Sequence, residues 1–248
     1  MLTTLTGLVI RETAVGESDK FINVLTHERG IVSIYCHRAR SIKSKHLSST
    51  QLFCYSEFMA TEKNDRFTLH DSTLIESFFA LRGDLTSFAL AQYVCSVASF
   101  VCSEEMDESD MLRLVLNTLY ATASGEKSHK LIKAAFEIAC ACLNGFAPSA
   151  DTCGVCDVAL LPTNSVKFDI ENGCLICEKC TTHGAMNISS GVVSTLRYIL
   201  DSTSKRLFSF SLADDDLAQF GQLAERYLLH HLDRDGFDTL DFYKTIQN

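Results

Sequence analysis

Two pairs of cysteines with the same short spacing are the residues in this sequence best suited to chemistry. Cys153 and Cys156 form one pair, and Cys177 and Cys180 form a second pair after twenty further residues. Two residues between cysteines allow one tight turn to direct both thiolates at the same ion, and two such turns complete the tetrahedron that zinc prefers. We therefore predict that these four cysteines bind one Zn²⁺.

The second pair has two rivals among its neighbours. Cys174 precedes Cys177 at the same spacing, and His183 follows Cys180 at that spacing again. Either residue could therefore replace one thiolate. We favour Cys177 and Cys180, because residues 173–176 are typical of a strand that leads into the pair.

A set of four thiolates predicts a structural role for the metal. A catalytic zinc site keeps one coordination position open and has an acid or base nearby. The chain also lacks the H-x-E triplet of zinc deaminases, a glycine-rich phosphate loop, a G-x-S-x-G sequence and an H-E-x-x-H sequence. We therefore expect no enzymatic activity. The total of 11 cysteines is odd, and no secretion signal accompanies them, so a disulfide framework is not expected.

A run of cations without acids is the second candidate site. No Asp or Glu occurs between residues 30 and 56, although the whole chain has 31 acidic against 22 basic residues and a net charge of −9. The run contains Arg38, Arg40, Lys43 and Lys45, together with several serines. Because it follows an expected strand, we predict an exposed loop of the kind that binds a phosphate backbone, with an ordinary solvated loop as the alternative.

The first 80 residues are typical of a small β-barrel. Short β-branched runs separated by polar turns predict five strands. These strands cover residues 6–13, 21–26, 31–36, 52–61 and 67–76. The turns that join them include a hairpin turn at 27–30 and a polar turn at 62–66, which contains Asp65.

Helical spacing of apolar residues begins near Arg82 and returns through the rest of the chain. The expected helices cover residues 85–97, 109–125, 127–143, 190–200 and 214–232. A cysteine-bearing segment at 150–185 interrupts them, and its Pro162 and Asn172-Gly173 predict a short hairpin that brings the cysteine pairs together. We therefore predict an α+β fold, with a barrel domain at 1–80 and a helical domain at 81–248.

Neither a membrane span nor an export signal is expected. No stretch of about 18 consecutive apolar residues is present, and such a stretch is what a transmembrane helix requires. The N-terminus lacks the basic flank and apolar run of a secretion signal. A cytoplasmic location is therefore the expectation.

Three segments of the N-terminal part and one at the C-terminus together resemble a known family. They read ETAVGESDK at 12–20, LTHERG at 25–30, RARSIKS at 38–44 and GFDTLDF at 236–242. This combination is similar to bacterial RecO, the recombination mediator family of DNA repair. The resemblance implies an N-terminal OB-fold barrel, then an α-helical domain with an inserted four-cysteine zinc knuckle. The chain departs from the family pattern at Arg38 and at Cys174, where glycine is usual, and in its acidic balance.

The resemblance also implies a function. It implies a non-catalytic protein that binds single- and double-stranded DNA, anneals complementary strands and helps to load recombinase onto DNA coated by single-strand-binding protein (SSB), in a cytoplasmic, nucleoid-associated setting after DNA damage. Its partners would be the RecR protein and the C-terminal tail of SSB. Annealing requires a surface that offsets the repulsion between phosphates, and the residues expected to form it are Arg38, Arg40, Lys43 and Lys45, with Arg11 and Lys20 as additions.

Two further expectations concern contacts of this kind. Phe21 and Tyr35 lie on expected strands and could stack bases, although we favour a core position for both. An apolar groove on the helical domain is expected to bind the partner tail, with Leu116, Tyr120, Arg197 or Arg226 as candidates to line it. The alternative is a zinc-stabilised adaptor that binds only proteins, which the acidic balance favours.

Overall fold

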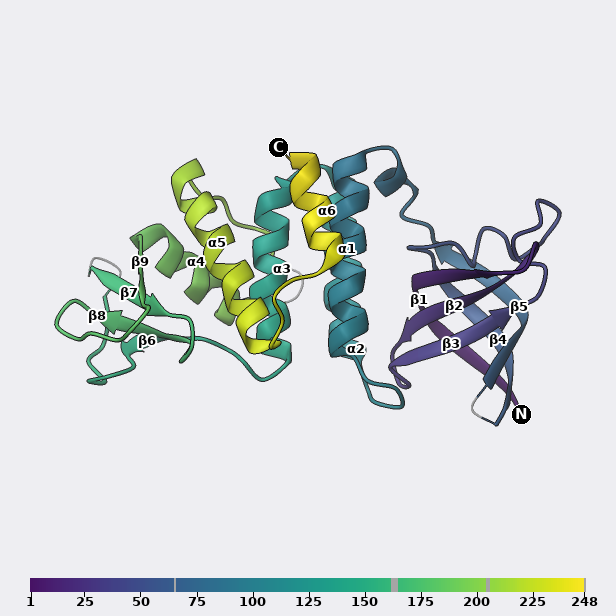
Figure 1. The fold of residues 1–248 in the computed structure, drawn as a ribbon, viewed down its shortest axis with the longest axis horizontal. Coiled ribbons are helices and arrows are strands. Elements are labelled where there is room, and N and C mark those ends of the chain that lie inside the picture. The colour runs from purple at the N-terminus through teal and green to yellow at the C-terminus, as the bar shows by residue number, and fades with distance from the viewer. Residues whose placement is uncertain (65, 162–164, 204–205, 248) are drawn as a thin grey trace. The chain divides into compact units, whose positions relative to one another are not determined.

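The computed structural model describes residues 1–64, 66–161, 165–203 and 206–247. Two residues named in the sequence analysis lie outside these ranges: Asp65 of the expected turn and Pro162 of the expected hairpin segment. The chain divides into two compact units (Figure 1). One consists of Met1–Ala123 with Phe242–Asn248, and the other is Ser124–Asp241.

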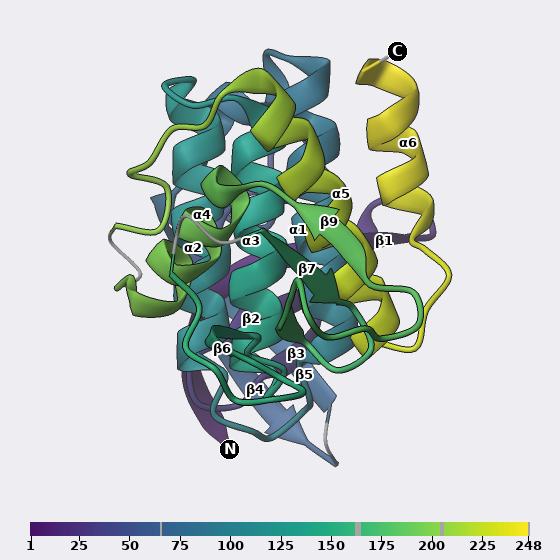
Figure 2. The same cartoon turned by 90° about the vertical axis from the view of Figure 1, so that its left-hand side faces the viewer.

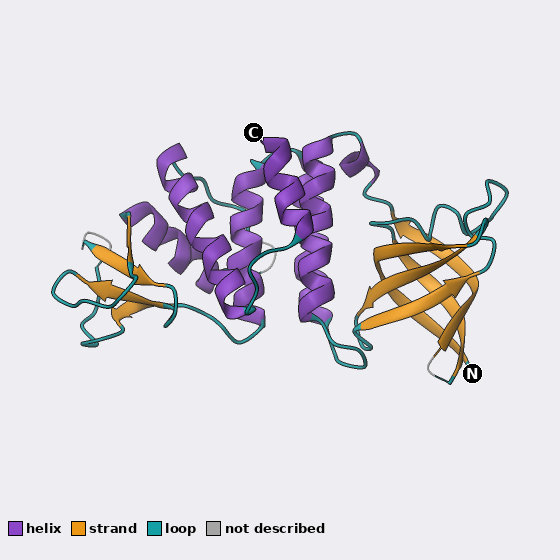
Figure 3. Ribbon diagram, in the orientation of Figure 1, coloured by secondary structure: helices purple, strands orange, loops and turns teal. Residues whose placement is uncertain are grey.

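Five strands of the first unit close into a barrel (Figure 3). They are β1 (Leu2–Val15), β2 (Asp19–Thr26), β3 (Ile31–Cys36), β4 (Tyr55–Lys63) and β5 (Arg66–Glu76). Their order is β1-β2-β3-β5-β4, with β4 paired to β1 and the one parallel pairing between β3 and β5. Alternate residues point inward, so that Ile22, Val24, Ile34 and Phe58 form a fully buried core. The five predicted strands and the barrel are confirmed.

Gly30 lies in the turn between β2 and β3, at a point where the backbone comes very close to the segment around Ser103. Its φ of 56° lies in the left-handed region, and a Cβ there would stand 1.8 Å from the carbonyl oxygen of Ser103. The N–H of Ile31 donates to that same oxygen at 3.3 Å, and the N–H of Glu105 donates to the Arg29 carbonyl at 3.0 Å. The close backbone approach at this turn therefore requires glycine.

The helices of the first unit begin directly after the barrel. They are the 3-10 helix η1 (Phe79–Arg82), α1 (Leu85–Val101) and α2 (Ser109–Ser124). Asp84 caps the start of α1, because its Oδ2 accepts the N–H of Ser87 at 2.7 Å. A further helix, α6 (Asp238–Gln247), ends the chain and was not among the predicted helices.

The second unit combines three helices with a small sheet. Its helices are α3 (His129–Leu143), α4 (Ser190–Asp201) and α5 (Asp214–His231), and its strands are β6 (Ser149–Cys153), β7 (Val166–Asp169), β8 (Cys174–Cys177) and β9 (Met186–Ile188). The sheet order is β6-β8-β7-β9, and β6 contacts α4. Figure 2 shows this unit from the side of β7 and β9. The antiparallel pair β7–β8 is the predicted hairpin. In the described ranges, no helix is both long and apolar enough to cross a membrane.

Candidate nucleic-acid interface and cysteine cluster

The four predicted cysteines come together at one end of the small sheet. Cys153 ends β6 and Cys177 ends β8, so the parallel pairing of these strands places the two turns side by side. The sulfur atoms of Cys153, Cys156, Cys177 and Cys180 all lie within 4.8 Å of one another. The Sγ atoms of Cys156 and Cys177 are 3.8 Å apart. A tetrahedral zinc with bonds of about 2.3 Å requires sulfurs about 3.8 Å apart, so the donor set fits this ion.

Hydrogen bonds in the cluster favour a metal-binding thiolate. Burial opposes ionisation of Cys153, but the backbone N–H groups of Cys177, Val155 and Cys156 point at its sulfur, and together they lower the pKa of this thiol to about 6. The N–H of Cys177 lies 3.3 Å from that sulfur. Hydrogen bonding to the other cysteines raises the pKa of Cys180 to about 12. Because the thiolate is the ligand form, binding of zinc would release the protons that the thiols still hold.

The two rival ligands stand outside this group of four sulfurs. Cys174 begins β8, and its Sγ packs against Gly154, where a Cβ would stand 2.3 Å from it. Neither Cys174 nor His183 belongs to the cluster that could hold a metal. The preference for Cys177 and Cys180 therefore agrees with the geometry.

Arg197 ties the cysteine-bearing segment to α4. Its Nε donates to the Ala150 carbonyl at 2.8 Å, and its Nη2 donates to the Leu160 carbonyl at 2.6 Å. These bonds give Arg197 a structural role, so it is a poor candidate to line a partner groove. Of the other groove candidates, Tyr120 and Arg226 are exposed and Leu116 is half-buried.

The predicted basic loop is anchored at its start by Asp19, the first residue of β2. Asp19 Oδ1 accepts the backbone N–H of Arg38 at 2.7 Å, and Oδ2 accepts the hydroxyl of Tyr35. His37 Nδ1 lies 3.2 Å from the same carboxylate. The Tyr35 hydroxyl first and the Arg38 N–H second hold the pKa of Asp19 well below its usual range. The sequence identified Asp19 only as part of the family-like segment, because its partners lie on β3 and in the loop that follows β3.

The turn between β1 and β2 braces the same loop a few residues further on. The backbone N–H of Arg40 donates to the Ser18 carbonyl at 2.9 Å. The Arg40 guanidinium donates from Nη1 to the Gly16 carbonyl at 3.0 Å. The start of the loop is therefore held in place by the turn rather than left to solvent.

The backbone at Arg38 adopts a conformation that glycine favours. Its φ is 50°, in the left-handed region, where an L side chain meets the following carbonyl. The loop therefore carries the Arg38 side chain at a cost in backbone strain.

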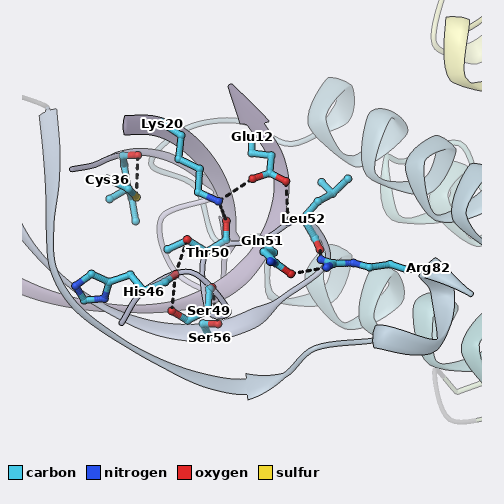
Figure 4. A network of polar contacts seen from close by, with 11 residues as sticks. Glu12, Lys20, Cys36, His46, Ser49, Thr50, Gln51, Leu52, Ser56 and Arg82 are labelled. Atoms are coloured by element: carbon cyan, nitrogen blue, oxygen red, sulfur yellow. Dashed lines mark hydrogen bonds and ion pairs between the residues drawn. The ribbon is translucent and has the colours of Figure 1, made fainter. Parts of the chain in front are cut away.

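The predicted cations divide into an exposed group and one buried residue. Arg38, Arg40, Lys43 and Lys45 are exposed on the loop, and Arg11 is exposed on β1. Lys20 is only 3% exposed, which corrects its prediction as part of the DNA-contacting surface. Its Nζ is bound by Glu12 Oε2 at 2.7 Å and by the Thr50 carbonyl at 2.8 Å (Figure 4). Strand alternation on β2 directs this side chain inward.

An aromatic pair lies on the outer face of the barrel beside the loop. Phe21 on β2 and Tyr35 on β3 are directly paired, with ring centroids 5.2 Å apart. Phe21 is 40% exposed, so the preference for a core position was wrong for this residue: its neighbours Lys20 and Ile22 take the inward positions. Tyr35 is half-buried. The pair offers ring surface of the kind on which bases stack.

A closed five-stranded barrel of this strand order defines the class of OB-fold proteins. In this chain the barrel has a basic loop and aromatic residues on its second and third strands. Helices and a cysteine cluster follow the barrel in the sequence. Comparison with known families agrees with this class. Residues 1–78 match the family model described as "Recombination protein O N terminal", and residues 82–241 match "Recombination protein O C terminal".

Individual relatives carry the same name. A protein of Acetivibrio thermocellus called DNA repair protein RecO is 33% identical over 242 residues, which is 97% of this chain and 95% of the relative. The protein of that name from Dehalococcoides mccartyi is 30% identical over 86% of this chain and 84% of its own length, and that of Symbiobacterium thermophilum is 27% identical over 92% and 91%. The chain belongs to the RecO family of DNA repair proteins.

Proposed function

We propose that this member of the RecO family is a non-catalytic recombination mediator that binds single- and double-stranded DNA, anneals complementary strands and helps to load recombinase onto SSB-coated DNA. The observation that supports it best is the braced loop, which exposes Arg38, Arg40, Lys43 and Lys45 in a chain of net charge −9. A local excess of cations raises the potential that phosphates meet, whatever the overall charge, although Lys45 also pairs with Asp71 at 2.9 Å. DNA binding is assigned to residues 1–80 and protein binding to 81–248.

The barrel surface supplies two kinds of contact in this proposal. The loop cations and Arg11 neutralise phosphates of the two strands, which reduces their mutual repulsion. Phe21 and Tyr35 stack single-stranded bases, which leaves the pairing edges of those bases accessible. Lys20 makes no direct phosphate contact on this surface, because its ammonium is held by Glu12 and Thr50.

The second unit has the supporting role. One structural Zn²⁺ on Cys153, Cys156, Cys177 and Cys180 links the ends of β6 and β8. The proposed protein partners are RecR and the C-terminal tail of SSB, as membership of the RecO family suggests, and the proposed location is the cytoplasm, in association with the nucleoid.

The test is the anisotropy of labelled single-stranded DNA over a salt series. The loop variant replaces Arg38, Arg40, Lys43 and Lys45 by Ala. The matched control removes the same number of exposed cations outside residues 1–80, at Arg113, Lys130, Arg206 and Lys244. We expect the loop variant to bind about tenfold more weakly at low salt, with a salt slope smaller by up to about 3, and the control to stay close to wild type. Absence of binding by the wild type at low salt would overturn the proposal and favour the protein-only adaptor.

A further inference from the structure

A pocket of about 360 Å³ opens on the first unit, beside the anchored part of the basic loop. Three cations from different segments line it: Lys20 from β2, Arg40 from the loop and Arg82 from η1. Glu12 on β1 is the one carboxylate among its lining residues in the described chain. The charges that line the pocket therefore sum to about +2.

The ammonium of Lys20 is held in a fixed position in this pocket. Lys20 Nζ is bound by Glu12 and by the Thr50 carbonyl, and its side chain is 4% exposed. Glu12 also accepts the N–H of Leu52 at 3.4 Å through Oε1 (Figure 4). Because these groups are already ordered, a ligand that meets their field loses little to reorganisation of the protein.

The two guanidinium groups are oriented by carbonyl and amide oxygens. Arg82 donates from Nη2 to the Leu52 carbonyl at 2.8 Å and from Nη1 to the Gln51 side chain (Figure 4). Arg40 donates from Nη1 to the Gly16 carbonyl. A guanidinium has five N–H donors, so each of these side chains keeps donors beyond the bonds named here. Both residues are exposed, so a ligand can reach them from solvent.

Three of the other lining residues are apolar: Leu47, Leu52 and Phe88 on α1. The fourth is Gln51, whose side-chain oxygen accepts from Arg82. A pocket that combines fixed positive charge with apolar side chains matches a ligand that carries a phosphate on an uncharged sugar and base.

Charge distinguishes between the phosphates that DNA offers. A phosphate inside a strand is a diester with one negative charge, whereas a phosphomonoester carries about −1.5 to −2 at neutral pH. The sum of +2 matches the monoester. We propose that this pocket binds the terminal phosphate of a DNA strand, with Arg40 and Arg82 in direct contact and Lys20 contributing its field from below. This inference rests on the proposed function, because it takes DNA as the ligand.

The test compares oligonucleotides of one sequence that carry a 5′-phosphate, a 3′-phosphate or hydroxyl groups at both ends, with an internal label. One phosphorylated end is expected to bind about tenfold more tightly than the hydroxyl-ended strand, the size of one charge-assisted hydrogen-bonded contact. Arg82→Gln and Arg40→Gln should each reduce this preference to about one. Lys43→Gln is the matched control, because Lys43 lies on the loop but not in the pocket; it should weaken binding of all three strands and keep their ratio.

The outcomes separate this inference from the proposed function. Equal affinity of the wild type for all three strands, together with salt-dependent binding, would overturn the terminal-phosphate site and leave the DNA-binding proposal standing. A preference that persists in both Gln variants, with folding checked by thermal melting, would also overturn it. If no strand binds, calorimetry compares the binding of deoxythymidine monophosphate with that of thymidine. Binding of the monophosphate alone would keep a phosphomonoester site in the pocket but overturn its assignment to DNA. Absence of binding by the monophosphate would overturn both the site and its assignment.

Discussion

The carboxylate of Asp19 accepts the backbone N–H of Arg38 at 2.7 Å, and this bond joins the first residue of β2 to the start of the basic loop. The same carboxylate accepts the hydroxyl of Tyr35, one half of the exposed aromatic pair. One acidic side chain therefore holds both the backbone at the start of the basic loop and one ring of the proposed DNA surface. The acid is part of a basic surface because it positions that surface, in spite of its charge.

Asp19→Asn tests this positioning role. Removal of a negative charge beside four cations would tighten DNA binding if long-range charge alone mattered. We expect the opposite, a loss of severalfold in affinity, because the loop loses the acceptor that orders it. Anisotropy at one salt concentration checks the sign. Glu17→Gln, which removes an exposed acid in the neighbouring turn, is the matched control and should bind DNA at least as tightly as wild type.

The stability that Asp19 contributes should depend on pH in one direction. The Tyr35 hydroxyl and the Arg38 N–H lower its pKa in the folded protein, whereas the unfolded chain has an ordinary value of about 3.9. A lowered carboxyl pKa gives stability that is present above about pH 4 and is lost as pH falls toward the folded value. The difference in melting temperature between wild type and Asp19→Asn should therefore shrink from pH 6 to pH 3. A difference that grows over this range would contradict the assignment.

Arg38 should show a conflict between stability and binding. At a φ of 50°, Arg38→Gly relieves the contact that an L side chain makes in the left-handed region, and Arg38→Ala keeps it. Both variants lose the same charge, so their comparison isolates the backbone. We expect the glycine variant to exceed the alanine variant by about 1 kcal/mol in the free energy of unfolding. Urea denaturation measures this difference, and anisotropy should find both variants weaker than wild type for DNA.

Local patterns explain which parts of this structure could be predicted from sequence. The strands follow β-branched runs with a two-residue period, and the cysteine cluster follows from two short spacings, so each signal lies within a few residues. Lys20 was misassigned because it occupies an inward position of β2, where its charge is compensated by Glu12 and by the Thr50 carbonyl thirty residues away. Arg82 lines the pocket proposed to bind a terminal phosphate because η1 lies beside the Leu52 carbonyl, to which Arg82 donates. Such contacts depend on how the barrel closes, and a local sequence pattern does not determine that closure.

The metal assignment leads to a prediction with an internal control. Purified protein should contain about one zinc per chain, and Cys177→Ser should lose it, because its sulfur lies in the cluster. Cys174→Ser changes a buried thiol three residues away that is outside the cluster, and it should keep the metal. Metal analysis by mass spectrometry and melting with and without chelator measure both. Zinc retained by Cys177→Ser and lost by Cys174→Ser would mean that the ligands are misassigned.

Lys133 on α3 is expected to be the residue of the second unit most sensitive to substitution. Its ammonium lies 2.7 Å from Glu137 and 2.9 Å from Glu225 on α5, with side chains 8%, 0% and 20% exposed. Burial disfavours its charge, but the two glutamates outweigh this and raise its pKa. A raised lysine pKa gives stability that is present below the unfolded value of about 10.4 and is lost as pH rises through the folded value.

Lys133→Met would remove the ammonium that pairs with the buried Glu137 and the half-buried Glu225, so we expect a loss of about 3–5 kcal/mol in the free energy of unfolding. Lys130→Met, an exposed position on the same helix, should change it by less than about 0.5 kcal/mol. A triple variant with Met at 133 and Leu at 137 and 225 removes the charges together and should recover most of the loss, because apolar groups can replace a buried ionic cluster. Urea denaturation of the two single variants and the triple variant measures these free energies. A loss that the triple variant does not recover would mean that the packing of α3 on α5 depends on the ion network itself.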